Sequence, residues 1–274
     1  MSKDQCVMVK TEGGKVSYCA ITVDDCFFAI TRDEEWINEA INMLKTAFDE
    51  LTVERCETIN ILGMTVRLER AKGRAVINQN KRFVDNLITT YGVTKTVVTP
   101  ATGDLKYARE DSKLLEDQRM FMSLNAALMY ASKRTYPEIS FAVVYLSLRY
   151  NKATEDDYAK AIRVAEYIVG CGENHGLILS PKSLQLVAKS DASYVENADG
   201  KSHMGGAVGF ESDYACRFMW LSTKQPVVAL STCESELIAT CVPLAALRGE
   251  LDSSFKSWAM RRVLSGSELI TSAL

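Results

Sequence analysis

The sequence between residues 220 and 236 reads WLSTKQPVVALSTCESE, and it carries a change from strand to helix. The apolar run 216–221 predicts a short strand that leads into it. Ser231 and Glu234 then have the spacing of a capping box, in which two side chains satisfy each other's backbone donors. We therefore expect a helix that begins at about Cys233 and holds Glu236 in its first turns.

Short strands with turn signals between them precede this stretch, over residues 177–179, 184–190 and 205–210. Asp191 ends the second of these strands. A carboxylate at a strand end and another on a following helix can converge on a metal ion, so Asp191 and Glu236 are candidate ligands. A second interpretation stays open, in which Glu236 and Glu234 only interact with the positive end of the helix dipole.

The N-terminal segment predicts two consecutive hairpins. Gly13-Gly14 joins β-rich runs at 7–10 and 16–23, which is a strong short-range hairpin signal. Asp24-Asp25 forms a tight corner before the next run, 26–30. Adjacent carboxylates repel each other and are tolerated best beside a cation such as Mg²⁺. Aspartate is also a common turn residue, and that alternative stays open.

The middle of the chain predicts one further strand pair and a set of helices. Residues 61–68 alternate as a strand does, and a turn at 71–74 leads to a short strand at 75–77. Gly92 has the position of a helix C-terminal cap. Residues 94–117 have the composition of a linker. Helices are expected over residues 35–51, 81–91, 120–134, 138–150 and 156–169, the last three forming a small bundle.

Charge is distributed unevenly along the chain. The whole sequence has 32 Lys and Arg against 35 Asp and Glu, a net charge of −3, which argues against a protein that coats nucleic acid with its entire surface. Residues 24–57 are acidic, whereas residues 66–95 are basic. The basic stretch predicts either a surface that follows a phosphate backbone or an ordinary solvated surface. Its candidate nucleic-acid-binding residues are Arg67, Arg70, Lys72, Arg74, Lys81 and Arg82.

Composition excludes several classes of protein. The 274 residues suggest about two domains, and 47% hydrophobic with 24% charged residues excludes a largely disordered chain. No apolar run approaches the ~20 residues of a membrane helix, and residues 1–10 carry no secretory leader. The 8 cysteines form no C-x-x-C pair and there are 2 histidines, which argues against a zinc site. We expect reduced cysteines and an intracellular location, in the cytoplasm, the nucleus or both.

The order of these features resembles the pol region of copia-type LTR retrotransposons. Residues 23–25 resemble the Tyr-x-Asp-Asp box of reverse transcriptases, and residues 190–194 with 220–236 resemble the ribonuclease H segment. Two further matches lie between them. They are Ile61-Leu62-Gly63-Met64, which is similar to the family's Phe-Leu-Gly-Ile, and residues 124–130 with 135–139, which are similar to its Ser-Leu-x-Gly-x-Leu-x-Tyr and Thr-Arg-Pro-Asp-Ile pair.

The resemblance implies an α+β fold in four parts. Residues 1–68 would be the end of a reverse-transcriptase palm with its hairpins, and residues 69–172 a mainly helical thumb and connection. Residues 176–250 would form a truncated ribonuclease H-like domain, a mixed sheet with a helix. Residues 251–274 are an unassigned tail.

The resemblance also implies an activity and its residues. Asp24 and Asp25 would carry the polymerase metal site, and Asp191 with Glu236 would be two members of the ribonuclease H carboxylate cluster. Glu236 is preferred over Glu234 because the family's catalytic Glu precedes an aromatic residue or Leu, here Leu237. The cofactor would be Mg²⁺, and the partners would be RNA, DNA or an RNA–DNA hybrid and other polyprotein parts, with no membrane.

Departures from the family pattern predict an impaired or inactive enzyme. The first palm Asp and the fingers are missing, and Thr22 replaces an aromatic residue. Pro243 should kink or shorten the helix that carries Glu236. No Asp-Asn strand follows Leu251. The alternative function is a non-catalytic nucleic-acid-binding or structural remnant of a retroelement. A third possibility is the product of a decayed gene without a stable fold.

Overall fold

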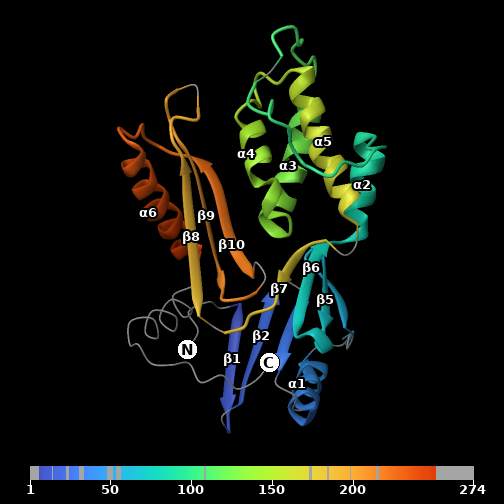
Figure 1. The fold of residues 1–274 in the computed structure, drawn as a ribbon. Coiled ribbons are helices and arrows are strands. Elements are labelled where there is room, and N and C mark those ends of the chain that lie inside the picture. The colour runs from blue at the N-terminus through green and yellow to red at the C-terminus, as the bar shows by residue number, and fades with distance from the viewer. Residues whose placement is uncertain are drawn as a thin grey trace.

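The computed structural model describes residues 6–13, 15–22, 25–30, 34–47, 52–53, 57–107, 109–172, 175–183, 185–197, 199–213 and 216–250 (Figure 1). This part of the chain contains ten strands in three antiparallel sheets and six α-helices. The mixed α+β class predicted from the sequence is confirmed.

The first sheet is a three-stranded meander that confirms both predicted N-terminal hairpins. Its strands are β1 (Val7–Glu12), β2 (Lys15–Thr22) and β3 (Asp25–Ile30), paired in that order. Gly13 has φ +56°, the left-handed conformation that a tight turn requires. Helix α1 (Glu34–Ala47) follows. The helix was predicted to extend to residue 51, and residues 48–51 lie outside the described residues.

The second sheet begins with a hairpin where the sequence pattern predicted one strand. β4 (Thr58–Ile61) and β5 (Met64–Glu69) are joined by Leu62 and Gly63, with φ of +51° and +75°. Two successive positive φ angles make the type of two-residue turn that suits hairpins. The expected strand over 61–68 is therefore wrong at its start, because apolar alternation continues through the turn and Leu rarely adopts positive φ. Short helix η1 (Arg70–Lys72) leads to β6 (Arg74–Gln79).

Strand β7 (Leu177–Leu179) completes this sheet from far along the chain. It pairs antiparallel with β6, and Ile77 is opposite Leu177. Gly176 makes the approach possible, because a Cβ at this position would collide with the carbonyl oxygen of Ile77. The helices between β6 and β7 are thus inserted between two neighbouring strands.

The inserted segment forms the predicted helical bundle and contains the main hydrophobic core. Its helices are α2 (Lys81–Tyr91), α3 (Gln118–Arg134), α4 (Ser140–Ser147), preceded by the short helix η2 (Pro137–Ile139), and α5 (Glu155–Cys171). Phe121, Leu124 and Leu128 of α3 are fully buried, as are Leu146 of α4 and Val164 of α5. Asn80 and Gly92 cap the two ends of α2, so this helix has the bounds that the sequence predicted.

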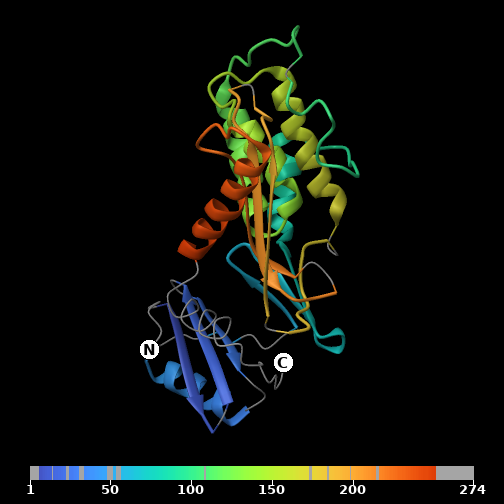
Figure 2. The ribbon, with the colours of Figure 1, turned by 60° about the vertical axis from the view of Figure 1, so that its left-hand side comes forward.

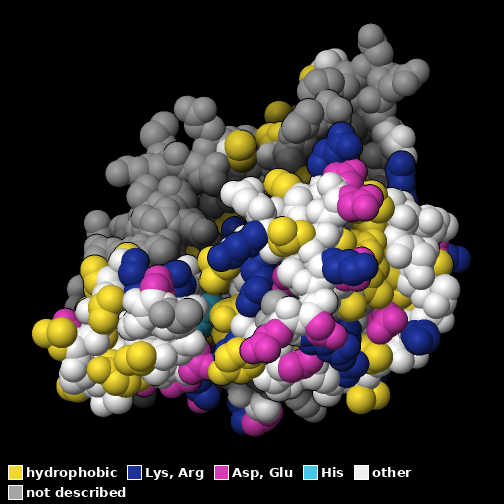
Figure 3. All heavy atoms as spheres, turned by 90° about the horizontal axis from the view of Figure 1, so that it is seen from above, with side chains coloured by type: hydrophobic (Ala, Val, Ile, Leu, Met, Phe, Trp, Pro, Cys, Tyr) yellow, Lys and Arg dark blue, Asp and Glu magenta, His cyan; other side chains and the backbone are white. Residues whose placement is uncertain are grey.

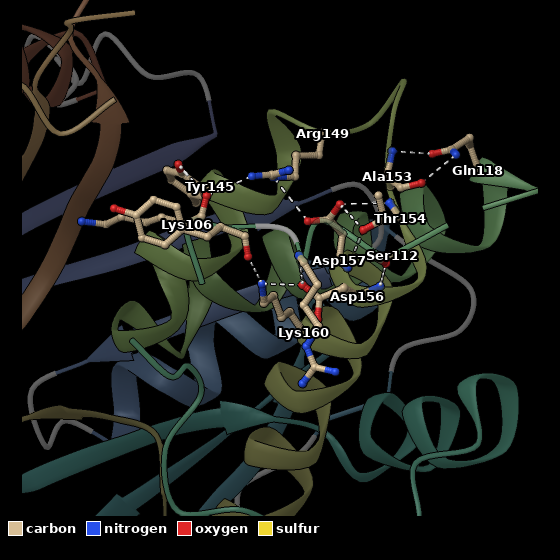
Figure 4. Close-up of polar contacts among 12 residues, drawn as sticks. Lys106, Ser112, Gln118, Tyr145, Arg149, Ala153, Thr154, Asp156, Asp157 and Lys160 are labelled. Atoms are coloured by element: carbon tan, nitrogen blue, oxygen red, sulfur yellow. Dashed lines mark hydrogen bonds and ion pairs between the residues drawn. The ribbon is translucent and has the colours of Figure 1, made fainter. Parts of the chain in front are cut away.

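A polar network holds the segment 94–117, predicted as a linker, against the ends of α4 and α5 (Figure 4). The Lys160 ammonium donates to the Tyr107 carbonyl at 2.5 Å and to Asp156 at 2.7 Å. The Asp157 carboxylate is buried, forms a capping box with Thr154 and pairs with Arg149 Nε at 3.3 Å. Because the buried Lys160 ammonium and the half-buried Arg149 guanidinium bind backbone carbonyls of this segment, the connection is part of the bundle.

The third sheet and the last helix form a separate layer beside the bundle. The strands β8 (Leu186–Ser193), β9 (His203–Phe210) and β10 (Arg217–Lys224) pair in the order β10-β9-β8. Helix α6 (Thr232–Glu250) packs on β8 and β9 (Figures 1 and 2). It continues through Pro243, so the expected shortening is wrong. A proline removes one intrahelical hydrogen bond, but its fixed φ is compatible with a helix.

No helix in the described ranges is long and apolar enough to cross a lipid bilayer.

Candidate carboxylate site and nucleic-acid interface

The candidate polymerase residues lie in or beside the β2–β3 turn. Asp24 is outside the described residues, and for Asp25 the structure describes the backbone, which begins β3 and pairs with Thr22. The predicted corner between two strands is therefore present. The role of Asp24 and Asp25 as metal ligands stays a prediction.

Asp191 and Glu236 are carried by two elements that pack together. Asp191 lies in β8 opposite Gly205 of β9, and Glu236 is the fifth residue of α6. The neighbouring hydroxyls Ser190 Oγ and Thr240 Oγ1 are 3.0 Å apart and link β8 to α6. Both carboxylate residues are exposed, and neither side chain has a hydrogen bond or ion pair within the part of the chain that the structure describes. Both carboxylates are thus free to meet a ligand.

Glu234 and Glu236 have different surroundings although they are two residues apart. The Glu234 carboxylate accepts from the Leu230 backbone N–H at 2.7 Å, and Ser231 Oγ accepts from the Glu234 N–H at 3.1 Å. Ser231 therefore accepts from the Glu234 N–H as predicted, but the Glu234 carboxylate binds the N–H of Leu230 and not that of Ser231, so the capping box is confirmed in one half only. Because Glu234 is occupied by the backbone, its neighbour Glu236 is the better candidate for binding.

A buried amide that the sequence pattern did not indicate fixes the start of α6. Gln225 Nε2 donates to the Ser235 carbonyl at 2.8 Å and to Ser235 Oγ at 3.2 Å, while its backbone N–H donates to Ser202. Gln225 and Ser235 are both fully buried. These bonds hold the β10–α6 connection against the first turn of α6, directly before Glu236.

Two side chains join the sheet of Asp191 to the helical bundle. Trp220 Nε1 donates to the Ser132 carbonyl of α3 at 2.7 Å. The His203 ring meets the Phe141 ring edge-on with centroids 4.9 Å apart, and its Nε2 shares a hydrogen bond with Ser222 at 2.7 Å. Burial, assisted by the nearby Lys106 charge, lowers the pKa of His203 to about 4. This histidine is therefore neutral at pH 7.

The described residues do not fit a closed magnesium centre by themselves. Carboxylate oxygens are the donors that Mg²⁺ prefers, and Asp191 with Glu236 supplies them. However, no group of three or more potential metal-binding side chains gathers anywhere in the described part of the chain. Ser190 contacts α6, and successive side chains of a strand point to opposite faces, so Asp191 lies on the face of β8 turned away from α6. No metal-dependent step can be assigned to Asp191 and Glu236.

The candidate cations Arg67, Lys72 and Arg74 surround a single carboxylate. Glu69 lies 3.4 Å from Arg67 Nε, 3.1 Å from Lys72 Nζ and 2.6 Å from Arg74 Nε. The hydrogen bonds from Arg74 and Lys72 lower the pKa of Glu69 to about 2. Since one anion meets three cations, this end of the β5–β6 hairpin keeps an excess of positive charge, to which Arg70 adds.

The six candidate cations do not form one compact group. Arg67, Arg70, Lys72 and Arg74 lie at or near the η1 end of the β5–β6 hairpin, whereas Lys81 and Arg82 begin α2 after the opposite end of β6. Further Lys and Arg side chains gather on both sides of the hollow between the β8–β10 layer and the bundle (Figure 3). A bound polyanion would thus have more than one basic area to contact.

Comparison with known proteins identifies three relatives, and each aligns with a similar number of residues of the chain. Over 235 residues, or 85% of the chain, it is 26% identical to the Retrovirus-related Pol polyprotein from transposon RE1 of Arabidopsis thaliana and 25% identical to that from transposon RE2. It is 24% identical over 245 residues to the corresponding polyprotein from transposon TNT 1-94 of Nicotiana tabacum. No family model and no solved structure matches the chain.

The match covers a small share of each relative. The chain spans 15%, 16% and 18% of the length of these three polyproteins. Each alignment nevertheless includes at least 85% of the chain, so the similarity is not confined to one motif. The resemblance to the copia-type retrotransposon Pol polyproteins is confirmed, and the chain is a relative of one segment of them.

Proposed function

We propose that the chain is a nucleic-acid-binding segment of a copia-type Pol polyprotein, with an impaired or absent phosphoryl-transfer activity. It would combine the end of a reverse transcriptase with a ribonuclease H-like unit and would act beside other polyprotein parts. The observation that carries the proposal is the set of cations at the η1 end of the β5–β6 hairpin and at the exposed start of α2. Its substrate class would be an RNA–DNA hybrid.

The expected loss of catalysis follows from the number of ligands. A two-metal centre holds both ions with several carboxylates so that attacking and leaving oxygens are both stabilised. Two exposed carboxylates leave most of the coordination to water, and water reorganises during the reaction where a fixed ligand does not. The two carboxylates therefore do not support cleavage of a phosphodiester by themselves.

The expected binding follows from the cations. Guanidinium groups match phosphate oxygens with two parallel hydrogen bonds, and exposed Lys side chains add charge. Arg67 and Arg74 are held by Glu69, while the Lys81 and Arg82 side chains are exposed on the first turn of α2. The η1 end of the β5–β6 hairpin and the first turn of α2 would contact the sugar–phosphate backbone, and such contacts do not depend on the base sequence.

Hybrid cleavage by the full chain in Mg²⁺ tests the catalytic part of the proposal. We expect no cleavage of a labelled RNA–DNA hybrid above a no-protein control, and the same result for Asp191→Asn and Glu236→Gln. Primer extension by the full chain, compared with the same assay on the Asp25→Asn variant, tests the polymerase residues in the same way. Robust cleavage or extension that disappears in these variants would show that the chain is a working enzyme.

Salt-dependent binding tests the nucleic-acid part. The logarithm of the hybrid-binding constant should fall linearly with the logarithm of salt concentration, and Lys81→Ala with Arg82→Ala should reduce the slope by roughly one unit per lost phosphate contact. Lys182→Ala is the matched control, since Lys182 is an exposed lysine that pairs with Asp213 elsewhere on the surface. Binding that is absent, or insensitive to salt, would refute this part.

A further inference from the structure

An exposed tyrosine near the C-terminal end of α3 is held in place by two neighbouring elements. Tyr130 lies one turn before the end of this helix and is 40% exposed. Its hydroxyl donates to the Leu62 carbonyl, in the turn between β4 and β5, at 2.7 Å. Its ring meets the Phe83 ring of α2 with centroids 6.4 Å apart and planes tilted by 42°. The aromatic ring is therefore fixed in position and still accessible to solvent.

The guanidinium group of Arg134 lies over the Tyr130 ring. Its Cζ is 5.9 Å from the ring centre, and the two residues are four positions apart on α3, so their side chains share one face of the helix. Arg134 is exposed and forms no ion pair with a carboxylate in the part of the chain that the structure describes. A cation in the last turn also favours the helix dipole, but that effect does not require an aromatic ring beside it. The pair presents a planar cation backed by an aromatic ring.

The surroundings of Tyr130 and Arg134 are basic. Gln79 Nε2 donates to Thr135 Oγ1 at 2.9 Å, which brings the start of α2 beside the end of α3. Lys81 and Arg82 in the first turn of α2 are exposed, as is Lys133 in the last turn of α3. Among the described residues, no carboxylate pairs with any of these three cations. Proteins that bind single-stranded nucleic acid combine aromatic and guanidinium planes with unpaired cations in this way.

We propose that Tyr130 and Arg134 form a stacking site for an unpaired nucleobase, next to cations that bind the sugar–phosphate backbone. The inference rests on the proposed nucleic-acid binding and adds to it a preference for unpaired bases. One base stacks on the exposed guanidinium plane of Arg134, while Lys81, Arg82 and Lys133 are near enough to meet the adjoining phosphates. A base inside a duplex cannot enter, because its neighbours cover both of its faces. The ligand is thus a single-stranded extension of a hybrid, of any base sequence.

Binding of three ligands to the full chain tests the proposal. The first is a blunt RNA–DNA hybrid, the second is the same hybrid with a short unpaired extension, and the third carries an abasic extension of equal length. The second and third ligands have the same number of phosphates, so their affinities differ only through the unpaired bases. Fluorescence anisotropy at one salt concentration should show that the extension with bases binds about tenfold more tightly than the abasic extension, the order expected for one stacked base.

Variants locate the stacking site through the ratio of these two affinities. Tyr130→Leu should bring the ratio close to one, whereas Tyr130→Phe, which keeps the ring, should retain most of it. Arg134→Lys should also lose most of the ratio, because it keeps the charge but removes the planar group. The matched control is Tyr194→Leu, since Tyr194 is likewise 40% exposed but follows β8 in the other layer, and it should leave the ratio unchanged. Thermal melting checks that each variant is folded.

The outcomes separate the stacking site from the proposed function. If the blunt hybrid binds in a salt-dependent manner but the two extensions bind equally, the stacking site is refuted while the proposed binding stands. If none of the three ligands binds, the proposed function itself is refuted. A preference for bases that persists in both Tyr130→Leu and Arg134→Lys would also overturn the proposal, because the bases would then stack elsewhere. The comparison of the two extensions needs no variant, so it decides even where a substitution prevents folding.

Discussion

The helical bundle and the β8–β10 layer are stabilised in different ways. In the bundle, apolar side chains from four helices are fully buried against one another, Phe121 and Leu128 among them. In the layer, every residue of β10 is half-buried, and Met204 is one of few large apolar side chains that are fully buried. The start of α6, the helix that packs on this layer, is instead fixed by the hydrogen bonds of Gln225 to Ser235.

This difference separates stability from the candidate site. Hydrophobic burial is the main favourable contribution to folding, so the bundle supplies most of it. The carboxylates Asp191 and Glu236 need solvent and ligand access, which a deep core would deny them. The β8–β10 layer can keep both carboxylates exposed. Hydrogen bonds within the layer and to the bundle hold the geometry of the layer in place of a deep core.

The largest expected effect is a loss of bundle packing. Phe121→Ala should lower the free energy of unfolding by about 4 kcal/mol, because it removes a fully buried aromatic ring and leaves a cavity. Urea denaturation monitored by circular dichroism measures the change. The control is Met122→Ala on the same helix, which is 39% exposed and should cost less than about 1 kcal/mol. Equal effects would mean that the bundle is not the main core.

A second effect comes from acid acting where the layer meets the bundle. His203 has a folded-state pKa of about 4, below the ordinary value of 6.5. The unfolded chain therefore binds this proton first, and stability should fall as pH decreases from 6.5 to 4, by up to about 3 kcal/mol. Comparison with His203→Gln isolates the effect from the carboxylates that also titrate. Parallel pH profiles for the two proteins would contradict the burial of a neutral imidazole.

The smallest of the three effects concerns the start of α6. Gln225→Ala removes both hydrogen bonds to Ser235 inside a buried site and should cost about 2 kcal/mol. Gln185→Ala is the matched control, because Gln185 is exposed before β8 and the change should stay within about 0.5 kcal/mol. Hydrogen exchange of the first turn of α6 locates the loss. Unchanged protection there would show that Gln225 does not position Glu236.

Local features of the fold could be predicted from the sequence because their causes are local. The bounds of α2 follow from its apolar periodicity and the Gly92 cap, and the start of α6 follows from Ser231 and Glu234. The Leu62–Gly63 turn was missed because its signal is a backbone angle that Leu seldom adopts. The continuation of α6 through Pro243 was missed because a proline inside a helical pattern marks only a probable boundary.

The candidate site could be predicted in part for the same reason. Strand ends and caps marked Asp191 and Glu236 as residues on adjoining elements. The roles of Gln225, Trp220 and His203 depend on contacts with residues far along the chain, for which periodicity gives no signal. Charge counting marked the basic stretch but did not indicate that Glu69 holds three of its cations.

The pairing of β7 with β6 also constrains the order in which the chain folds. Ile77 and Leu177 are one hundred positions apart in the sequence. The length-dependent part of the entropic cost of closing a flexible loop of that length is about 4 kcal/mol. Three residues of strand recover little of this, so β7 is expected to join the sheet only after α2–α5 have collapsed and brought its ends together. The backbone amides of β7 are therefore reporters of the bundle: their exchange with solvent should follow its opening, although they lie in a sheet.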